Sequence, residues 1–308
     1  MAVYVNTNVS SLNGRRYLNN VQSQLTTTYQ RLSSGMRINS AKDDAAGLQI
    51  SSRLTTQING LNQGNRNASD GVALAQTAEG AMDEITGMLQ KIRTLAVQAR
   101  NGTNTLDDRK ALSKEATALA DEITRIAKQT KFGGAQVLDG AAGLLTKGGG
   151  GKNEIGKLTL QVGANKGDTI DFEINAMKFS NIASTGKVDK ADLEKFWKTP
   201  QGAQGGTPAI TFTKADDIDA AITALDKMIG AVDASRAGLG AIQNRLESSI
   251  RNQANVSANQ ADARSRIRDA DFAEESANLS QQSIIQQAAS SMLMQANTRP
   301  QLGLSLLG

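Results

Sequence analysis

The sequence predicts a mainly α-helical protein. Long antiparallel helices of the heptad type are formed by its N- and C-terminal segments, with a small β-hairpin region and a rudimentary outer insertion between them. Apolar residues recur every seven positions toward both ends of the 308-residue chain, as in helices that bury a continuous seam. Charge is scarce at both ends, because residues 276–298 carry no charged side chain and residues 1–30 carry only Arg15 and Arg16. Part of the middle alternates apolar and polar residues instead, which is typical of strands.

The first helix is expected from about Val5 to Ser33. It should end before Gly35, because glycine readily takes the left-handed conformation that closes a helix. Its apolar residues follow a heptad pattern, and those predicted to pack are Leu18, Val21, Leu25 and Leu32. Since this helix is almost free of charge, we expect it to pair with the equally charge-poor segment at the other end of the chain.

Two further helices are predicted before residue 134. The second is expected over roughly 41–98, opened by a capping box of Ser40 and Asp43. Its strict heptad row consists of Leu61, Ala68, Ala75, Met82, Leu89 and Ala96. The third begins at Thr105 and carries Leu112, Leu119 and Ile126 at the same spacing.

The middle of the chain changes character. The glycine-rich stretch 141–154 is interpreted as a loop, and the alternating runs KLTLQV and DTIDFEI around GANKGD predict a hairpin over 157–175. Residues 177–213 contain the only tryptophan and show no periodicity beyond a short helix expected at 190–197. Beyond this helix the pattern predicts no regular element for the segment.

Heptads return from Asp216 onward. One row is Ile218, Leu225, Val232, Leu239 and Leu246, and its companion row is Ile222, Ile229 and Ile250. A helix of about 50 residues would be about 75 Å long. It would need the long N-terminal helix beside it to bury this seam.

The C-terminal segment 276–298 predicts a helix with one apolar side and no charged side. In a helical polymer each side chain lies near copies of itself, so a charge would meet like charges. Neutral glutamine, serine and asparagine avoid that repulsion, and the segment is therefore interpreted as an assembly helix. The residues predicted to mediate polymerisation are Leu18, Val21, Leu25, Leu32, Leu279, Ile284, Ile285, Met292 and Leu293.

Composition excludes several kinds of chemistry. The chain has no cysteine and no histidine, which removes disulfides, thiol and imidazole catalysis and the common zinc sites. The pairs Asp43–Asp44 and Asp269–Asp271 allow a metal or acid–base site, but carboxylates are also common at helix ends, which is the favoured interpretation. We expect no enzyme activity, cofactor or metal.

Binding to nucleic acid or insertion into a membrane is not expected either. Arg264, Arg266 and Arg268 alternate with acidic residues and no aromatic residues interleave with them. The uncharged C-terminal segment 276–298 is too polar to span a bilayer, because more than half of its residues are serine, glutamine, asparagine or threonine. The N-terminus shows neither the basic start nor the apolar core of a cleaved secretory signal.

Several long motifs in order make the chain resemble bacterial flagellin. They are NTNVSSLNGRRYLNNVQSQL, RLSSGMRINSAKDDAAGLQIS, QKIRTLAVQA, LQVGANKGDTI and SRIRDADFAEESANLSQQSIIQQAASSMLMQAN with a final LSLLG. The resemblance implies a subunit that self-assembles into the flagellar filament, the helical propeller of swimming bacteria. It implies three regions. They are terminal helices 1–43 with 269–308 in the filament core, a helical shell of 44–176 with 214–268 that includes the hairpin at 157–175, and a small, variable, surface-exposed outer segment 177–213.

The resemblance also implies partners and a location. The subunit would be exported with a chaperone through the flagellar secretion channel and added beneath a cap protein, next to hook-junction proteins, in the extracellular flagellum. Flagellins also present a segment to a host Toll-like receptor, and the positions matching that segment here are Gln90, Lys91, Leu95 and Glu115. Lys91 stands where arginine is usual and Thr94 where glutamate is common, so weaker recognition is expected.

Two alternatives remain at this point. One is a hook–filament junction or accessory protein with flagellin-like ends, although the 90–98 segment and the LSLLG end favour a filament subunit. The other is a flagellin-like protein that carries a metalloprotease in its outer segment. The absence of histidine eliminates the HExxH form of that enzyme.

Overall fold

The computed structural model describes residues 7–140, 146–147, 155–198 and 209–305. The chain divides into two compact units: a terminal unit, Met1–Asn59 with Val256–Gly308, and a central unit, Gly60–Asn255. These boundaries differ from the expected borders at 43/44 and 268/269, because the first turns of the second helix and the last turns of the long C-terminal-half helix belong to the terminal unit. The assignment of the terminal helices to a filament core stays a prediction.

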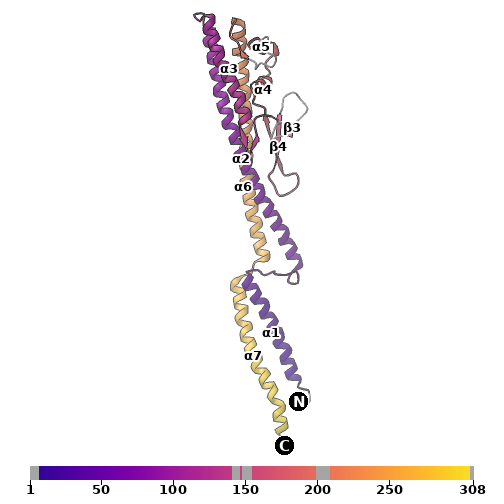
Figure 1. The fold of residues 1–308 in the computed structure, drawn as a ribbon. Helices are drawn as coiled ribbons and strands as arrows, with labels where there is room; N and C mark the ends of the chain where they lie inside the picture. Colours follow the sequence, from indigo (N-terminus) through magenta and orange to yellow (C-terminus); the bar gives the residue numbers. More distant parts are fainter. Residues whose placement is uncertain (1–6, 141–145, 148–154, 199–208, 306–308) are drawn as a thin grey trace. The chain divides into compact units, whose positions relative to one another are not determined.

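Two helices dominate the terminal unit, α1 (Val9–Ser34) and α7 (Phe272–Ser305), which lie side by side (Figure 1). Helix α1 begins after Asn8, whose Oδ1 accepts a hydrogen bond from the Ser11 backbone N–H at 3.1 Å. It ends at Gly35, which has a φ of 68° and so takes the left-handed conformation expected of a closing glycine. The expected start at Val5 lies outside the described residues.

The connector after α1 corrects the expected start of the second helix. Helix α2 (Ala45–Arg100) begins at Ala45 rather than Ala41. Asp43 does contact Ser40, but its Oδ2 accepts from the backbone N–H groups of Asn39 and Ser40 and therefore closes a turn ahead of the helix. The helix itself is capped by the next residue, because Asp44 Oδ1 accepts from the Gly47 N–H at 2.8 Å.

In the central unit, α2 packs against α3 (Leu106–Gln129) and α6 (Ala215–Arg268). Both predicted heptad rows, that of α2 from Leu61 to Ala96 and that of α6 from Ile218 to Leu246, are buried throughout, which confirms them. Helix α3 starts at a capping box in which Thr105 and Asp108 exchange hydrogen bonds. Its deepest positions are Ala116, Ala120, Ile123 and Ala127, while the predicted Leu112, Leu119 and Ile126 are partly buried beside them.

Ion pairs along the outside of this seam fix the antiparallel register. Arg93 and Arg100 lie one heptad apart on α2, and their guanidinium groups contact the carboxylates of Asp226 and Asp219, one heptad apart on α6. Exposed pairs of this kind add little to the stability of a fold, because solvent screens the charges. Their effect is selective, because a sliding of one helix along the other would separate them.

The predicted hairpin is present. Strand β4 (Ile155–Gln161) pairs antiparallel with β5 (Thr169–Asn175), and β3 (Thr146–Lys147) adds to the other edge of β4. Leu158 lies opposite Phe172, and Ile170, Phe172 and Ile174 all face the core. A separate two-stranded sheet, β1 (Lys131–Phe132) with β2 (Ala135–Gln136), follows α3.

The described part of 177–213 is not confined to the surface. It folds into α4 (Phe179–Thr185), α5 (Lys190–Phe196), and the paired strands β6 (Trp197–Lys198) and β7 (Ala209–Ile210). The rings of Phe179 and Trp197 stack with their centroids 4.3 Å apart. The side chains that this segment buries in the core are those of Met177, Phe179, Ile182, Ala183, Phe196, Ile210 and Phe212. Its elements are too short to show a periodic pattern, which is why the sequence did not predict this packing.

The hairpin packs closely on α2 at positions where α2 carries glycine. A Cβ atom added at Gly64 would lie 2.0 Å from the backbone oxygen of Val162, and one at Gly60 would lie 2.8 Å from the Ala164 side chain. Separations below 3.0 Å are not tolerated by real Cβ atoms, and at Gly64 the neighbour is backbone, which cannot rotate away. These glycines therefore allow the hairpin to approach the helix.

We predict that Gly64→Ala lowers the free energy of unfolding by roughly 1–3 kcal/mol, as overpacked substitutions do. The matched control is Gly87→Ala on the same helix, where an added Cβ meets nothing within 4 Å. There the higher helix propensity of alanine should raise stability by up to about 1 kcal/mol. Chemical denaturation of both variants measures the difference, and equal stability would contradict the close approach.

Candidate assembly surface

The antiparallel contact between α1 and α7 has a narrow apolar seam. Val21, Leu25 and Ala289 are its buried apolar members. The other apolar residues along the seam are only half-buried, namely Leu18, Leu32, Leu279, Ile285 and Leu293. A Cβ added at Gly14 would lie 3.2 Å from Leu293 Cδ1, so this glycine lets the two helices approach closely near the end of the pair.

Polar side chains also tie α1 to α7. The hydrogen bonds run from Asn8 Nδ2 to the Ala296 carbonyl (2.8 Å), from Ser11 Oγ to Asn297 Oδ1 (2.7 Å), and from Thr28 Oγ1 to Gln282 Oε1 (3.3 Å). Among the described residues one ion pair joins the two helices, between Arg31 and the buried Glu275 at 3.6 Å. Neutral hydrogen bonds therefore provide most of the polar contacts.

Backbone contacts determine the point at which the end of α1 meets the start of α7. The Ala270 N–H donates to the Gly35 carbonyl at 3.0 Å, and the Arg37 N–H donates to the Arg268 carbonyl at 2.7 Å. Met36 and Asp269 form an isolated antiparallel bridge between these two contacts. The end of α1 is thus fixed against the start of α7, which brings Arg31 opposite Glu275.

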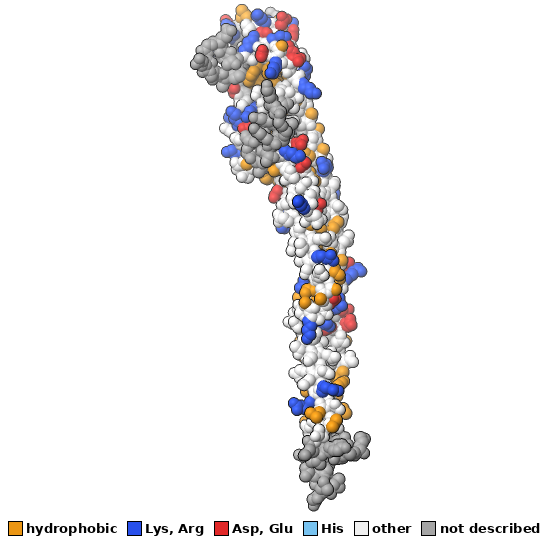
Figure 2. Space-filling model, turned by 90° about the vertical axis from the view of Figure 1, so that its right-hand side faces the viewer, with side chains coloured by type: hydrophobic (Ala, Val, Ile, Leu, Met, Phe, Trp, Pro, Cys, Tyr) orange, Lys and Arg blue, Asp and Glu red, His pale blue; other side chains and the backbone are white. Residues whose placement is uncertain are grey.

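Large apolar side chains remain exposed outside the seam. Ile284 is 66% exposed, and others on the two helices are also mostly exposed: Val9, Leu12, Tyr17, Tyr29, Phe272, Met292 and Met294. Charge is rare around them, and Figure 2 shows a mostly white surface over the terminal helices with scattered orange side chains and a few blue ones. Several large exposed apolar side chains with little charge among them make this surface a candidate for contact with another molecule.

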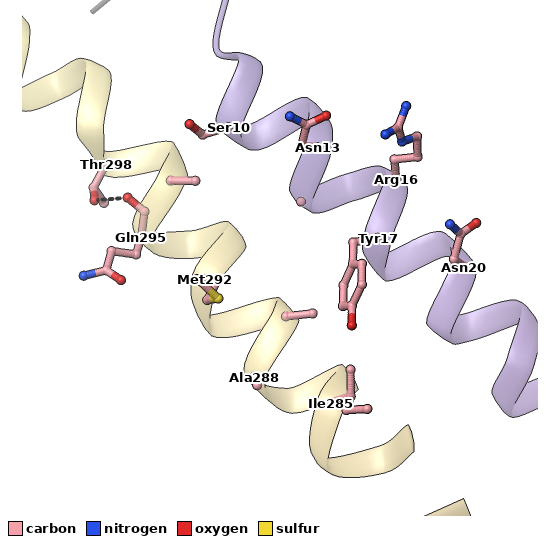
Figure 3. Close-up of a pocket in the computed structure, with 13 residues that line it drawn as sticks. Ser10, Asn13, Arg16, Tyr17, Asn20, Ile285, Ala288, Met292, Gln295 and Thr298 are labelled. Carbon is pink, nitrogen blue, oxygen red and sulfur yellow. Dashed lines mark hydrogen bonds between the residues drawn. The ribbon is translucent and has the colours of Figure 1, made fainter. Parts of the chain in front are cut away.

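Part of this surface is a groove between α1 and α7 with a volume of about 1150 Å³. Tyr17 lines it from α1, while Ile285, Ala288 and Met292 line it from α7 (Figure 3). Tyr17, like Leu12 and Tyr29, was not among the predicted residues, because it lies off the heptad row. Tyr17 could have been predicted as exposed, because it is a large apolar residue outside the heptad row of a helix with little charge.

The nine residues predicted to mediate polymerisation therefore fall into two groups. Most of them pack, fully or partly, in the seam between α1 and α7 of the same chain. Ile284 and Met292 lie outside it and are available to another molecule. The structure thus distinguishes residues that pack between α1 and α7 from residues that these two helices leave exposed.

The four positions predicted to contact a receptor lie in the central unit. Gln90 is exposed, and the Lys91 ammonium lies 3.4 Å from the Glu115 carboxylate on α3, both largely exposed. Leu95, in contrast, is 7% exposed and belongs to the core, so its side chain is not presented with the other three. The exposed apolar residue nearby on α2 is Val97.

Within the acidic pairs, Asp43, Asp44 and Asp271 each cap a turn or a helix. Hydrogen bonds from the backbone N–H groups of Ser40 and Asn39 lower the pKa of the Asp43 carboxyl from its usual value. Asp271 Oδ1 accepts from the Ala273 N–H at 2.8 Å and so caps α7. Among the described residues, no group of three or more acidic residues is placed to hold a metal ion. Within the same residues, no helix has the length and apolar character needed to cross a membrane.

The sequence matches two family patterns: the bacterial flagellin N-terminal helical region over residues 5–142 and the bacterial flagellin C-terminal helical region over residues 222–307. The chain belongs to the bacterial flagellin family. Members of this family are structural and non-enzymatic, so this flagellin is a structural subunit of the flagellum and a component of its extracellular filament.

Relatives support the same conclusion. This flagellin is 36% identical to flagellin A of Vibrio anguillarum over 392 aligned residues and 38% identical to polar flagellin C of Vibrio parahaemolyticus over 383, with 100% of both chains covered in each case. Both alignments are longer than the 308 residues of this chain, so each relative carries residues without a counterpart here. These full-length relatives are flagellins, which favours a filament subunit over an accessory protein.

A solved structure shows the same fold. It is described as a flagellar hook-associated protein from Vibrio parahaemolyticus, and the two chains superpose with a TM-score of 0.54 at 17% sequence identity. The match covers 74% of this chain and 100% of the other. At this low identity the likeness concerns the fold alone.

The narrow seam between α1 and α7 leads to a prediction about the unassembled chain. Little apolar surface is fully buried there to offset the entropy of ordering two long helices. Amide hydrogen exchange should therefore be faster in residues 18–32 and 279–293 than in residues 225–246 of α6, and it should slow on polymerisation. Equal protection of these segments before assembly would contradict the prediction.

Proposed function

We propose that this flagellin polymerises into the filament by packing the exposed apolar faces of α1 and α7 against the same helices of neighbouring copies. The observation that carries the proposal is the exposed apolar surface described above, which the chain does not bury by itself. Burial of apolar area contributes about 25 cal/mol per Å². Side chains such as Ile284, mostly exposed in one chain, would supply that area in the polymer.

The scarcity of charge supports a homopolymer over binding to an unrelated protein. In a helical array every charged side chain is repeated at each subunit, so a charge near the axis faces its own copies. On α1 the charged side chains are Arg15, Arg16 and Arg31, and on α7 before Arg299 they are Glu274 and Glu275. The remaining polar residues are neutral and can form hydrogen bonds across copies without repulsion.

The proposal is tested at Ile284, because its side chain contributes little to the isolated chain. We predict that Ile284→Asp abolishes the extension of filament seeds and leaves thermal unfolding of the monomer unchanged. A carboxylate enclosed by apolar neighbours would cost several kcal/mol if it stayed unpaired. Sedimentation after seeding measures assembly, and circular dichroism measures unfolding.

The matched control is Ile284→Leu at the same position. Leucine keeps the apolar character and nearly the same volume, so this variant should extend seeds like the natural chain. Normal filament growth of Ile284→Asp would contradict the proposed surface. If Ile284→Asp unfolded at a lower temperature while Ile284→Leu did not, Ile284 would instead contribute to the stability of the monomer.

Family membership supports a route to the filament as well. The subunit is exported with a chaperone through the flagellar secretion channel and added beneath the cap protein to a filament that starts at the hook-junction proteins. Disabling the secretion channel should remove the protein from the culture medium. Continued secretion under that condition would contradict this route.

A second role, recognition by a host Toll-like receptor, is favoured by one observation. Gln90, Lys91 and Glu115 are exposed together on neighbouring helices, with Lys91 and Glu115 in contact. The expected contact through Leu95 is not part of this proposal, because that side chain lies in the core. Lys91 supplies a single point charge where a guanidinium would supply a planar pair of donors.

We predict that Lys91→Arg increases receptor activation in a cell reporter assay, because arginine can form two parallel hydrogen bonds with a carboxylate. The matched control is Lys110→Arg, since Lys110 is also exposed and pairs with Asp107 on its own helix at 2.9 Å. The control should leave activation unchanged. No gain from Lys91→Arg, or an equal gain from both variants, would count against the role of Lys91.

A further inference from the structure

The methionines of this chain differ sharply in their exposure. In the central core, Met82 and Met228 are 0% exposed and Met177 is 2% exposed. On α7, Met292 is 71% exposed and Met294 is 65% exposed. The two others that the structure describes, Met36 and Met88, are half-buried. Since the chain has no cysteine, thioethers are its only sulfur groups.

The two exposed methionines lie on the candidate assembly surface. Met292 lines the groove between α1 and α7, on the same side of α7 as Ile285 (Figure 3). Met294 follows two residues later and, at 3.6 residues per turn, lies on nearly the opposite side of the helix. Their exposure therefore covers two different faces of α7, both of them without charge.

We propose that Met292 and Met294 are the oxidation-sensitive sites of the unassembled subunit and that their oxidation to sulfoxides prevents the subunit from joining a filament. This inference rests on the proposed polymerisation through α1 and α7. The oxidant is a hydroperoxide, with hydrogen peroxide as the simplest case. Exposed methionine is a common target of such oxidants.

The reaction needs no catalytic group from the protein. A lone pair of the thioether sulfur attacks one peroxide oxygen, a sulfur–oxygen bond forms and the oxygen–oxygen bond breaks. The sulfur loses two electrons to the peroxide, whose second oxygen leaves as water after proton transfer from the first. The product is methionine sulfoxide, and methionine sulfoxide reductases restore the thioether.

Oxidation changes what the helix presents. A flexible apolar side chain becomes a polar one with a strong hydrogen-bond acceptor. In an interface that excludes water, this oxygen would have to be buried without a matched donor, which opposes assembly. On the isolated subunit both side chains face solvent, so the same change leaves the fold intact. Oxidation should therefore block assembly without unfolding the chain.

The first experiment treats the folded subunit briefly with hydrogen peroxide and follows each methionine by peptide mass spectrometry. Met292 and Met294 should gain oxygen several-fold faster than Met82, Met177 and Met228, which serve as internal controls. In assembled filaments Met292 and Met294 should react more slowly than in the free subunit. Equal rates for exposed and core methionines in the folded subunit would overturn the proposal.

The second experiment measures seed extension. Oxidised natural subunit should fail to extend seeds, and treatment with methionine sulfoxide reductases should restore extension. The double variant Met292→Leu with Met294→Leu replaces both thioethers by side chains of similar volume and should stay competent after peroxide. Loss of its activity after peroxide would overturn the proposal, because the sensitive group would then lie elsewhere. Repair by the reductases shows that a methionine sulfoxide causes the loss of extension, and the double variant shows that Met292 and Met294 are the methionines responsible.

The untreated natural subunit separates this inference from the proposed function. If it does not extend seeds, polymerisation through this surface fails, and the inference fails with it. If untreated subunits extend seeds and fully oxidised subunits do so equally well, only the inference about Met292 and Met294 is wrong.

Discussion

The central unit depends on one interaction, the burial of the α2 heptad row against that of α6. These rows come from segments more than a hundred residues apart, and each fully buried leucine or isoleucine contributes about 1.5–3 kcal/mol. Helix α3, the β4–β5 hairpin and the short helices α4 and α5 all pack onto this seam. The ion pairs Arg93–Asp226 and Arg100–Asp219 lie along its edge and select the register. A slip of one helix would break both the ion pairs and the packing.

The terminal unit follows a different principle. Its helices α1 and α7 bury few side chains fully and keep several large apolar residues exposed. If the α1–α7 seam covered all the apolar surface of these helices, little would be left for contact with other copies. Because the seam is narrow, several apolar side chains remain exposed. The low charge of both helices fits the same requirement, because like charges in a regular array repel. In the proposed polymerisation, incomplete burial and low charge would both favour contact between copies.

Several carboxylates near the starts of helices have structural roles. Asp43, Asp44, Asp108 and Asp271 each accept hydrogen bonds from backbone N–H groups in a turn or at the start of a helix. For Asp108, hydrogen bonds from the side chain and backbone of Thr105 lower the pKa. Because the folded-state pKa is depressed, the stability that this carboxylate contributes is present above its unfolded pKa and is lost as pH falls through its folded pKa.

The sequence by itself determined the helices, their apolar rows and the hairpin. Periodicity and turn chemistry are local properties, so the row Leu61–Ala96, the closing Gly35 and the strands around 163–168 were all predictable. Tertiary structure decided which residues those helices leave uncovered. It buried Leu95, placed Phe179 against Trp197 in the core, moved the start of α2 to Ala45, and exposed Tyr17 and Ile284. The physical reason is that burial depends on which distant segment covers a side chain, and no local pattern records that partner.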